Sequence, residues 1–401
     1  MVEQYGQQAS ACAAVLAGAD THQKNQALIA MADAIDASSD KLLQANEQDL
    51  AAAKQSGISD ALFDRLELNP ERIASMSKGL RDIAAQADPI GSMSATERQP
   101  TGLEIARMRV PLGVIGVIYE SRPNVTADAA ALCLKSGNAV ILRGGSEASR
   151  SNAAIAQCIS AGLQAAGLPE AAVQLVGTTD RAAVGAMLQL EEHIDVIIPR
   201  GGKGLVTRIA QDAKVPVIKH LDGICHVYVD TGADKEQAMA VAFNSKTYRY
   251  GICGSMETLL VAQSEAQSLL PDLCHQFTQH GVELRGCEKT QALVANVNSA
   301  TVSIKVVVDV NEAVEHVARY GSGHTDAIVT GSIERSRQFV RQVDSSSVMV
   351  NAATCFADGA QYGLGAEIGI STNKMHVRGP VGALGLTTEK YVVTGTGTIR
   401  Q

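Results

Sequence analysis

Short runs of β-branched and aliphatic residues alternate with helical segments through the middle of the chain, and this alternation most constrains the fold. The runs are apolar at successive positions, which is typical of strands buried on both faces. Such strands, separated by helices, form a parallel sheet with helices on both sides. The predicted strands are residues 113–118, 139–142, 173–176, 196–198 and 215–218, and the predicted helices are 127–134, 151–166, 181–190 and 205–212.

The same alternation resumes after Cys253 and predicts a second α/β domain. Before the first domain, residues 1–88 predict helices only, with Asp40 as a candidate N-cap of the helix that runs to residue 53. The predicted strands of the second domain are 258–261, 305–308, 327–330 and 347–350, its helices are 266–279, 310–320 and 333–343, and residues 358–380 are a glycine-rich loop.

Two β segments lie outside both α/β patterns. Residues 90–109 predict a hairpin with a turn at 100–102, and residues 390–394 predict a terminal strand. We expect these segments to pair outside both domains. Because exposed strand edges can pair with another chain, we also expect a homo-oligomer.

Composition excludes several classes of protein. A chain of 401 residues with 46% apolar and 19% charged residues is typical of a soluble protein of two or three domains. Its net charge is −8 and it has no basic run, which argues against nucleic acid or an anionic membrane as a partner. No apolar stretch is long enough to span a membrane. The eight cysteines show neither disulfide nor zinc spacing, so we expect a reduced, cytoplasmic protein without a metal.

Cys253 is the strongest candidate for catalysis. Glycine and polar residues flank it, so a substrate can approach the sulfur closely, and a thiolate attacks carbonyl carbon. Cys12, Cys133 and Cys158 lie in alanine-rich helical segments instead and are expected to be buried small apolar residues. Lys246 and Arg249 precede Cys253 and could lower its pKa or hold an anionic leaving group, or could be ordinary surface charges.

Polar loops follow the predicted strands of the first domain, where ligands of parallel sheets bind. Arg122 suits an anionic oxygen and Asn124 suits a developing oxyanion, although Asn124 or Thr126 could simply cap the next helix. The other candidates for cofactor binding stand in two glycine-containing loops, which could also be ordinary connections. They are Arg143 and Ser146 for the 2′-phosphate of NADP, Glu147 for ribose or the first helical turn, and Gly201 and Gly202 before a helix.

The order of these motifs resembles the gamma-glutamyl phosphate reductase family of the aldehyde dehydrogenase superfamily. The strings that carry the resemblance span nearly the whole chain. They are residues 110–128, 135–148, 198–204, 219–229, the segment around Cys253, 319–327 and 356–380.

The resemblance implies an aldehyde dehydrogenase-like fold: two doubly wound α/β domains plus a small β oligomerisation element. The implied cofactor domain comprises residues 1–94, 112–228 and 365–387. The implied catalytic domain is 229–364, and the β element is 95–111 and 388–401.

The resemblance also implies a reaction. The Cys253 thiolate displaces phosphate from L-glutamate 5-phosphate, with backbone N–H groups and Asn124 near the oxyanion. From their positive charge, Arg122, Lys246 and Arg249 are our candidates for binding the leaving phosphate of the substrate. The thioester is reduced with NADPH to glutamate 5-semialdehyde, the second step of proline biosynthesis from glutamate. Glutamate 5-kinase, which would supply the labile acyl phosphate, is an expected partner.

Two alternatives stay open. The first is an aldehyde-oxidising dehydrogenase that hydrolyses its thioester. Against it, His220 stands where hydrolytic relatives carry a water-activating Glu. The second is an inactive binding protein of the same fold, favoured only by an apparent shortening near residues 295–305.

Overall fold

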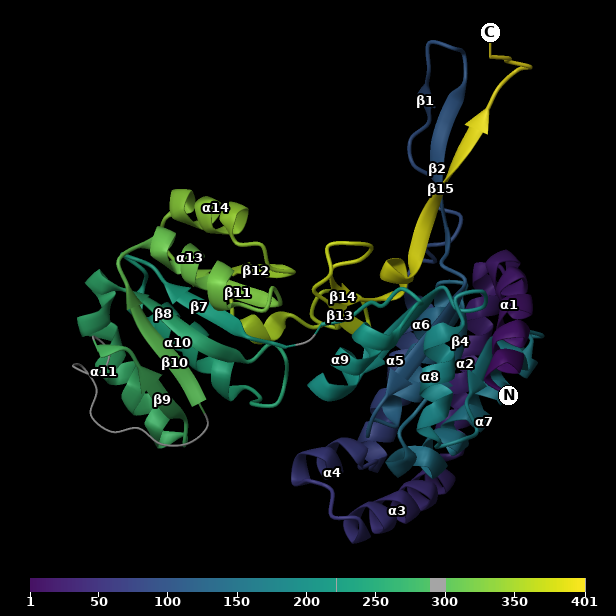
Figure 1. The fold of residues 1–401 in the computed structure, drawn as a ribbon, viewed down its shortest axis with the longest axis horizontal. Helices are drawn as coiled ribbons and strands as arrows, with labels where there is room; N and C mark the ends of the chain where they lie inside the picture. Colours follow the sequence, from purple (N-terminus) through teal and green to yellow (C-terminus); the bar gives the residue numbers. More distant parts are fainter. Residues whose placement is uncertain (221, 289–300, 401) are drawn as a thin grey trace. The chain divides into compact units, whose positions relative to one another are not determined.

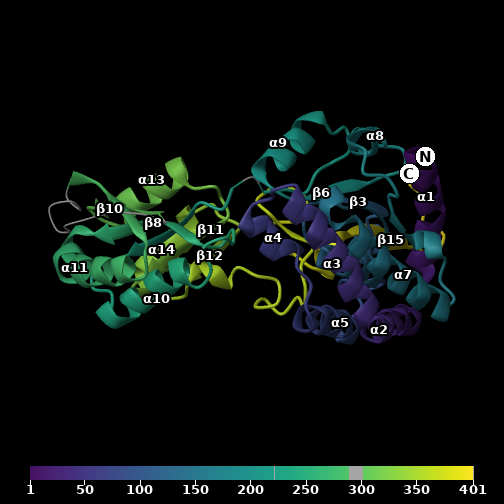
Figure 2. The same cartoon turned by 90° about the horizontal axis from the view of Figure 1, so that it is seen from below.

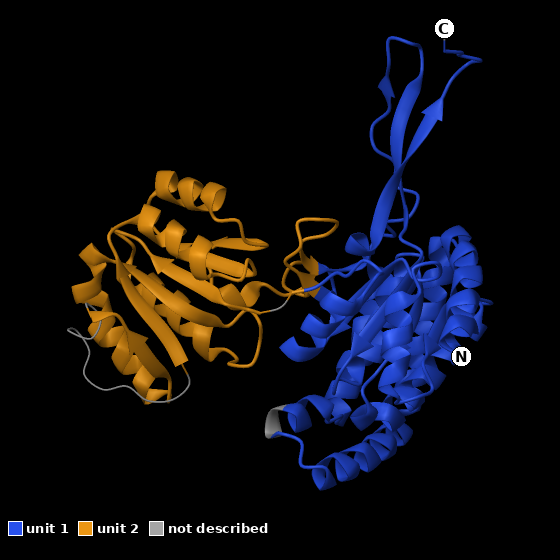
Figure 3. Cartoon of the chain, in the orientation of Figure 1, with its two compact units in different colours: residues 1–219, 363–369, 381–401 blue, residues 220–362, 370–380 orange. Residues whose placement is uncertain are grey.

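The chain folds into two compact units, which are described separately. The computed structural model describes residues 1–220, 222–288 and 301–400, so much of the apparently shortened segment lies outside the described residues. Unit 1 comprises residues 1–219, 363–369 and 381–401, and unit 2 comprises the described residues of 220–362 and 370–380 (Figure 3). The assignment of cofactor, catalytic and oligomerisation roles to parts of the chain stays a prediction.

A four-stranded parallel sheet forms the centre of unit 1, in the order β5-β4-β3-β6. All residues of β3 and β4 are buried, which explains why these strands are apolar at successive positions. The strands are β3 (Val114–Tyr119), β4 (Ala139–Arg143), β5 (Val173–Leu175) and β6 (Val196–Arg200), and the helices that follow them are α6 (Asn124–Lys135), α7 (Ser149–Ala165), α8 (Arg181–Gln189) and α9 (Lys203–Asp212).

The predicted strand at residues 215–218 is wrong. Only an isolated bridge forms there, between Val217 and Ile197. The Ile197 N–H donates to the Pro216 carbonyl, and the Ile218 N–H donates to the Ile197 carbonyl. Pro216 has no N–H to extend a ladder, which helps to explain why the pairing stops after one bridge.

Helices precede this sheet, as predicted. They are α1 (Val2–Gly18), α2 (Thr21–Ala37), α3 (Ser39–Gln55), α4 (Asp60–Leu66) and α5 (Pro70–Ala85). The predicted N-cap is wrong, because α3 begins after Ser38 and Asp40 lies in its first turn, where a negative charge favours the helix dipole. Within the described parts of the chain, none of the helices has the length and hydropathy required of a membrane span.

The two outlying β segments pair with each other in an antiparallel arm (Figure 1). Strand β2 (Glu104–Pro111) lies between β1 (Glu97–Arg98) and β15 (Thr387–Thr394). An ion pair of 2.7 Å between Arg109 and Glu389 links β2 to β15. The predicted pairing is therefore confirmed.

Unit 2 contains a six-stranded parallel sheet in the order β12-β11-β7-β8-β10-β9. Its first strand, β7, precedes Cys253, so the prediction that this domain begins after Cys253 is wrong. Strand β7 was not predicted because it contains the polar residue His226. In the structure His226 is buried, and its Nδ1 lies 2.9 Å from Asp326 Oδ1. The elements are β7 (Cys225–Val229), α10 (Lys235–Thr247), β8 (Met256–Ala262), α11 (Gln263–Gln279), β9 (Glu283–Gly286), β10 (Thr301–Val307), α13 (Val310–Tyr320), β11 (Thr325–Val329), α14 (Ile333–Gln342) and β12 (Ser347–Val350).

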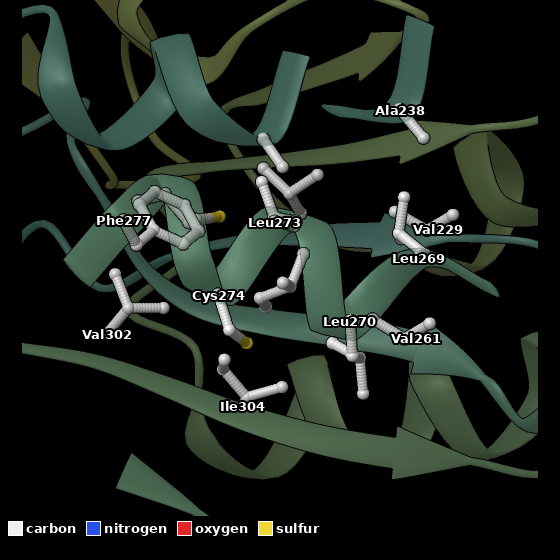
Figure 4. Close-up of a cluster of buried hydrophobic side chains, with 14 of the residues drawn as sticks. Val229, Ala238, Val261, Leu269, Leu270, Leu273, Cys274, Phe277, Val302 and Ile304 are labelled. Atoms are coloured by element: carbon white, nitrogen blue, oxygen red, sulfur yellow. The ribbon is translucent and has the colours of Figure 1, made fainter. Parts of the chain in front are cut away.

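Alternate residues of the unit 2 strands enter different cores, as expected for a sheet covered on both faces. Val227 and Val229 pack with residues of α10 and α11, part of which Figure 4 shows, whereas Tyr228 packs with α13 and α14. Helices α10 and α13 accordingly lie on opposite sides of the sheet (Figure 2). This arrangement confirms the predicted doubly wound architecture for unit 2.

The remaining short elements lie in connections. They are the 3-10 turns η1 (Ser146–Ala148), η2 (Glu170–Ala172), η3 (Thr354–Phe356) and η4 (Ala383–Leu386), and the strands β13 (Gly369–Ser371) and β14 (Gly379–Val381). The latter two interrupt the glycine-rich segment that was expected to be loop throughout.

The half-buried His316 of α13 makes the stability of the fold depend on pH. Burial, together with nearby His226, lowers the pKa of His316 to about 4 from its ordinary value of 6.5. The unfolded chain therefore binds this proton more readily than the folded chain. The stabilisation from neutral His316 is complete above pH 6.5 and is lost as the pH falls toward 4.

We expect His316→Gln to flatten the dependence of unfolding free energy on pH between 7.5 and 5. The expected difference is about 1 kcal/mol, allowing for partial solvent screening. Urea unfolding of both proteins at several pH values measures it. If the unfolding free energies of the two proteins change with pH in the same way, His316 is not the source of the pH dependence.

Candidate active site

Cys253 lies in the loop between α10 and β8, and its side chain is half-buried. A turn closed by the Ser255 N–H on the Ile252 carbonyl, at 3.1 Å, surrounds it. Cys12, Cys133 and Cys158 are buried, as predicted. Burial raises the pKa of the Cys133 thiol far above its ordinary value. The environment of Cys253 therefore differs from that of the buried thiols.

The backbone of Cys253 is held closely by the segment that leads into β7. The Cys225 thiol donates a hydrogen bond to the Cys253 carbonyl oxygen at 3.2 Å. Burial, followed by the charge of Asp326, raises the pKa of Cys225, so its thiol keeps the proton that this bond needs. A Cβ atom on Gly223 would lie only 2.1 Å from the same carbonyl oxygen. Position 223 therefore accommodates only glycine, because any side chain there would collide with the backbone of Cys253.

Two imidazoles lie beside the Cys253 sulfur. One ligand atom each from His220, Cys253 and His324 lie within 4.8 Å of one another. The two rings meet edge to face, with centroids 5.5 Å apart. The Nδ1 atom of His220 is 3.0 Å from the Ile370 carbonyl oxygen. Since a carbonyl only accepts, Nδ1 carries the hydrogen and Nε2 is the acceptor nitrogen of neutral His220.

His324 is fully buried, and its Nδ1 lies 2.9 Å from Thr325 Oγ1. Burial, with a smaller effect of His220, lowers the pKa of His324 to about 4. The sequence alone assigned His324 no catalytic or binding role. The useful signal was its place immediately before β11.

These side chains gather at the amino-terminal edge of the unit 2 sheet. Strands β11, β7 and β8 are parallel neighbours, and His324, the segment leading into Cys225, and Cys253 each precede one of them. Sequence reasoning looked to the carboxyl ends of strands, where ligands of open α/β sheets usually bind. That expectation explains why His220 and His324 were not predicted to be catalytic residues.

The basic residues proposed to hold the substrate differ in their surroundings. Lys246 is buried, and its ammonium pairs with Glu257 Oε1 at 3.0 Å. The negative charge of Glu257 offsets the positive charge of Lys246, which weakens the attraction that Lys246 can exert on a substrate phosphate. Arg249 is exposed in the loop before Cys253, and Arg122 is half-buried in the loop after β3. The substrate-binding roles of all three stay predictions.

Asn124 belongs to unit 1 and is the exposed first residue of α6. Pro123 occupies the N-cap position, so the alternative that Asn124 or Thr126 caps this helix is wrong. The Asn124 amide donates to Asp128 Oδ2 at 2.8 Å. Burial raises the pKa of Asp128 to about 6, against the opposing effect of this bond. The oxyanion role of Asn124 stays a prediction.

Two of the predicted cofactor residues at the end of β4 and in the loop after it, Arg143 and Glu147, form hydrogen bonds within the protein. Arg143 is buried, and its guanidinium donates to the carbonyls of Gly144 and Thr179 at 2.8 and 2.7 Å. Glu147 Oε1 accepts from the backbone and hydroxyl of Ser121, at 2.6 and 2.7 Å, which ties the loops after β3 and β4 together. Only Ser146 is exposed to solvent among these three predicted residues.

The third glycine-rich loop leads into α9. The Gly202 N–H donates to Glu120 Oε2 at 2.9 Å. A Cβ on Gly201 would meet the same oxygen at 2.4 Å, so glycine permits this close approach. The helix N-terminus thus already accommodates an anionic oxygen, which is the chemistry expected of a phosphate site.

The sequence and the fold both match known proteins. A model of the aldehyde dehydrogenase family matches residues 2–292. The chain belongs to the aldehyde dehydrogenase family, and it is an oxidoreductase that acts on an aldehyde group with a nicotinamide cofactor.

The more specific similarity is to gamma-glutamyl phosphate reductases. The structure of that enzyme from Thermotoga maritima is 41% identical, covers all of both chains and has a TM-score of 0.96. The enzyme from Saccharomyces cerevisiae is 29% identical, covers 100% of this chain and 98% of its own, and has a TM-score of 0.57. An acetylating aldehyde dehydrogenase from Geobacillus thermoglucosidasius shares the fold at 18% identity, with 100% and 97% coverage and a TM-score of 0.69.

The loops of unit 1 fit a nicotinamide dinucleotide. The start of α9 presents backbone donors that already bind a carboxylate, and Ser146 presents a hydroxyl at the start of η1. Arg143 fits a 2′-phosphate poorly, because its guanidinium already donates to the carbonyls of Gly144 and Thr179. Gly201, Gly202 and Ser146 are thus the predicted cofactor residues that the local geometry favours.

Proposed function

We propose that this chain reduces L-glutamate 5-phosphate to L-glutamate 5-semialdehyde and phosphate, with NADPH as the reductant. The full-length similarity at 41% identity to a gamma-glutamyl phosphate reductase carries this proposal. The local chemistry supports it, because a half-buried thiol stands beside two imidazoles. The proposed reaction is a step of proline biosynthesis.

The chain's own residues account for the acyl transfer. The Cys253 sulfur attacks the acyl carbon, and the acceptor nitrogen of His220 is proposed to take the thiol proton. Asn124 is proposed to donate to the oxyanion, with Asp128 orienting its amide. Phosphate departs and leaves a thioester on Cys253, while Arg122 and Arg249 are proposed to bind substrate oxygens.

When bound, a nicotinamide cofactor would supply the hydride for reduction of this thioester to the aldehyde level. The proposed cofactor residues are Gly201 and Gly202 at the start of α9 and Ser146 at the start of η1. The resulting thiohemiacetal on Cys253 releases the semialdehyde and restores the thiol. Once His220 has taken the thiol proton, its imidazolium cannot activate water against the thioester as a carboxylate would.

The reverse reaction tests the function with purified protein. Glutamate semialdehyde and NADP should yield NADPH only when inorganic phosphate is present, because phosphate must cleave the thioester. Oxidation that proceeds equally without phosphate would favour the hydrolytic dehydrogenase. No turnover under either condition, with the protein folded, would favour the inactive binding protein.

We expect Ser146→Glu to weaken the use of NADPH. A carboxylate near the 2′-phosphate adds like-charge repulsion, so the KM for NADPH should rise at least about tenfold while that for NADH changes little. Steady-state kinetics with both cofactors measure the ratio. Ser268→Glu, at an exposed serine of α11, is the matched control. A similar change in both variants would argue against the assignment.

We expect His220→Glu to make the thioester susceptible to water. A carboxylate there can act as a general base, worth typically 10²–10⁴-fold in rate. Phosphate-independent oxidation of the semialdehyde to glutamate should therefore appear. Product analysis by mass spectrometry separates glutamate from acyl phosphate, and an absence of glutamate from a folded, cofactor-binding variant would contradict the proposed role.

The assembly and location of the chain also remain proposals. Tyr391 and Val393 are exposed on β15, an edge strand of the arm, which suits pairing with a second copy. Sedimentation of the full chain beside a Tyr391→Lys variant tests that association. Partnership with glutamate 5-kinase and a cytoplasmic location are expectations from the biosynthetic role.

A further inference from the structure

A buried nitrogen without a partner marks the cluster around Cys253. His324 is fully buried, and its Nε2 has no hydrogen-bond partner among the described residues. Its other nitrogen, Nδ1, already contacts Thr325 Oγ1 at 2.9 Å. Leaving a buried polar atom unsatisfied costs about 1–3 kcal/mol, so native proteins rarely do so without a reason.

His324 also belongs to a group of three candidate metal ligands. One atom each from His220, Cys253 and His324 lie within 4.8 Å of one another, and all three residues belong to unit 2. The absence of zinc spacing in the sequence argued against a metal site. That argument does not apply here, because the three ligands come from well-separated parts of the chain.

The donor types select the metal. One sulfur and two imidazole nitrogens suit Zn²⁺, whereas Mg²⁺ and Ca²⁺ prefer oxygen ligands. Three protein ligands leave a fourth position for water, as in many zinc sites that are not purely structural. His220 also donates from Nδ1 to the Ile370 carbonyl at 3.0 Å, the outer contact that usually orients a metal-binding histidine.

The cluster requires only a small adjustment to bind zinc. With Zn–N near 2.0–2.1 Å and Zn–S near 2.3 Å, tetrahedral ligands stand roughly 3.4–3.6 Å apart. The separations of at most 4.8 Å must therefore shorten by about 1 Å, within reach of side-chain rotation. His324 is the fixed member, because it is buried and its carbonyl accepts from the Ser347 N–H at 3.1 Å.

We propose that His220, Cys253 and His324 form a Zn²⁺ site that reversibly blocks the catalytic sulfur. Binding exchanges the thiol proton for the metal: Cys–SH and Zn²⁺ give a zinc thiolate and a released proton, without oxidation or reduction. A sulfur bound to zinc no longer attacks an acyl carbon. The blocking effect rests on the proposed function, whereas the binding itself does not.

Equilibrium dialysis of the full chain against Zn²⁺ alone tests the site. We expect one tightly bound ion per chain in the unaltered protein and at least a tenfold weaker affinity in Cys253→Ala and His220→Ala. Cys355→Ala, at another half-buried cysteine of unit 2, should bind as the unaltered protein does. Circular dichroism confirms that each variant is folded.

Co²⁺ substitution gives a second measurement. A thiolate-to-cobalt charge-transfer band should appear in the unaltered protein and be absent from Cys253→Ala. Unchanged zinc affinity in both alanine variants, or no stoichiometric binding to the unaltered protein, would overturn the proposal.

Measuring turnover with and without Zn²⁺ tests the zinc site and the catalytic role of Cys253 separately. Stoichiometric Zn²⁺ should abolish phosphate-dependent turnover, and a chelator should restore it. Zinc bound through Cys253 without loss of turnover would confirm the site but refute the catalytic role of that sulfur. An active enzyme that binds no zinc would refute the site alone.

Discussion

Replacement of Cys253 by serine should lower turnover by at least about 10⁴-fold while leaving the fold and cofactor binding intact. A hydroxyl is a far weaker nucleophile than a thiolate at neutral pH. The two side chains differ by one atom, and the surrounding contact from the Cys225 thiol is made to the backbone carbonyl, which the substitution retains. Phosphate-dependent NADPH formation and cofactor titration measure the two quantities separately.

The matched control is Cys355→Ser, because Cys355 is also half-buried in unit 2. We expect this variant to keep most of its activity. Mass spectrometry of substrate-treated protein should find the acyl adduct on the peptide that contains residue 253. Retained turnover in Cys253→Ser would refute the thioester mechanism.

A single methyl group on Gly223 should also lower turnover, although less than the loss of the Cys253 thiol does. The added Cβ would stand 2.1 Å from the Cys253 carbonyl oxygen and 2.7 Å from its Cα, closer than any contact allows. Since both atoms belong to the backbone, the loop must move rather than a flexible side chain. A displacement of about 1 Å at a reacting group can cost 10²-fold in rate, and overpacking typically costs 1–3 kcal/mol of stability.

We therefore expect Gly223→Ala to lose about 10²-fold in kcat with a smaller change in cofactor affinity. Gly185→Ala in α8 is the control, because a Cβ there meets no atom within 4 Å. That control should be neutral or stabilised by up to about 1 kcal/mol. Steady-state kinetics and thermal unfolding of both variants measure these effects. Full activity of a folded Gly223→Ala variant would contradict the close approach of residue 223 to the Cys253 backbone.

Strands buried on both faces were readily predicted from sequence. The strands β3 and β4 appear within one residue of their expected limits, because burial on both faces leaves an unbroken apolar run. The prediction missed β7, because its buried His226 looks like a surface residue until Asp326 on the neighbouring strand is known. Residues 215–218 led to the opposite error. The apolar residues around Pro216 suggested a strand, but Pro216 lacks the N–H needed to extend a strand ladder.

The candidate site was predicted unevenly for a related reason. Cys253 stood out because of its local flanks, which are visible in a linear sequence. The adjacent His324 depends on the order of parallel strands, which periodicity does not reveal. Likewise, the charge of Lys246 looked available until its partner Glu257 was located.

The contact between Glu120 and the first turn of α9 affects how any anion enters that site. An internal carboxylate already neutralises the Gly202 donor, so an incoming phosphate exchanges with it instead of filling bare donors. The affinity of such an anion would consequently be the difference between its own binding to the Gly202 N–H and that of the Glu120 carboxylate. The displaced Glu120 carboxylate would then need water or a new cation as its partner.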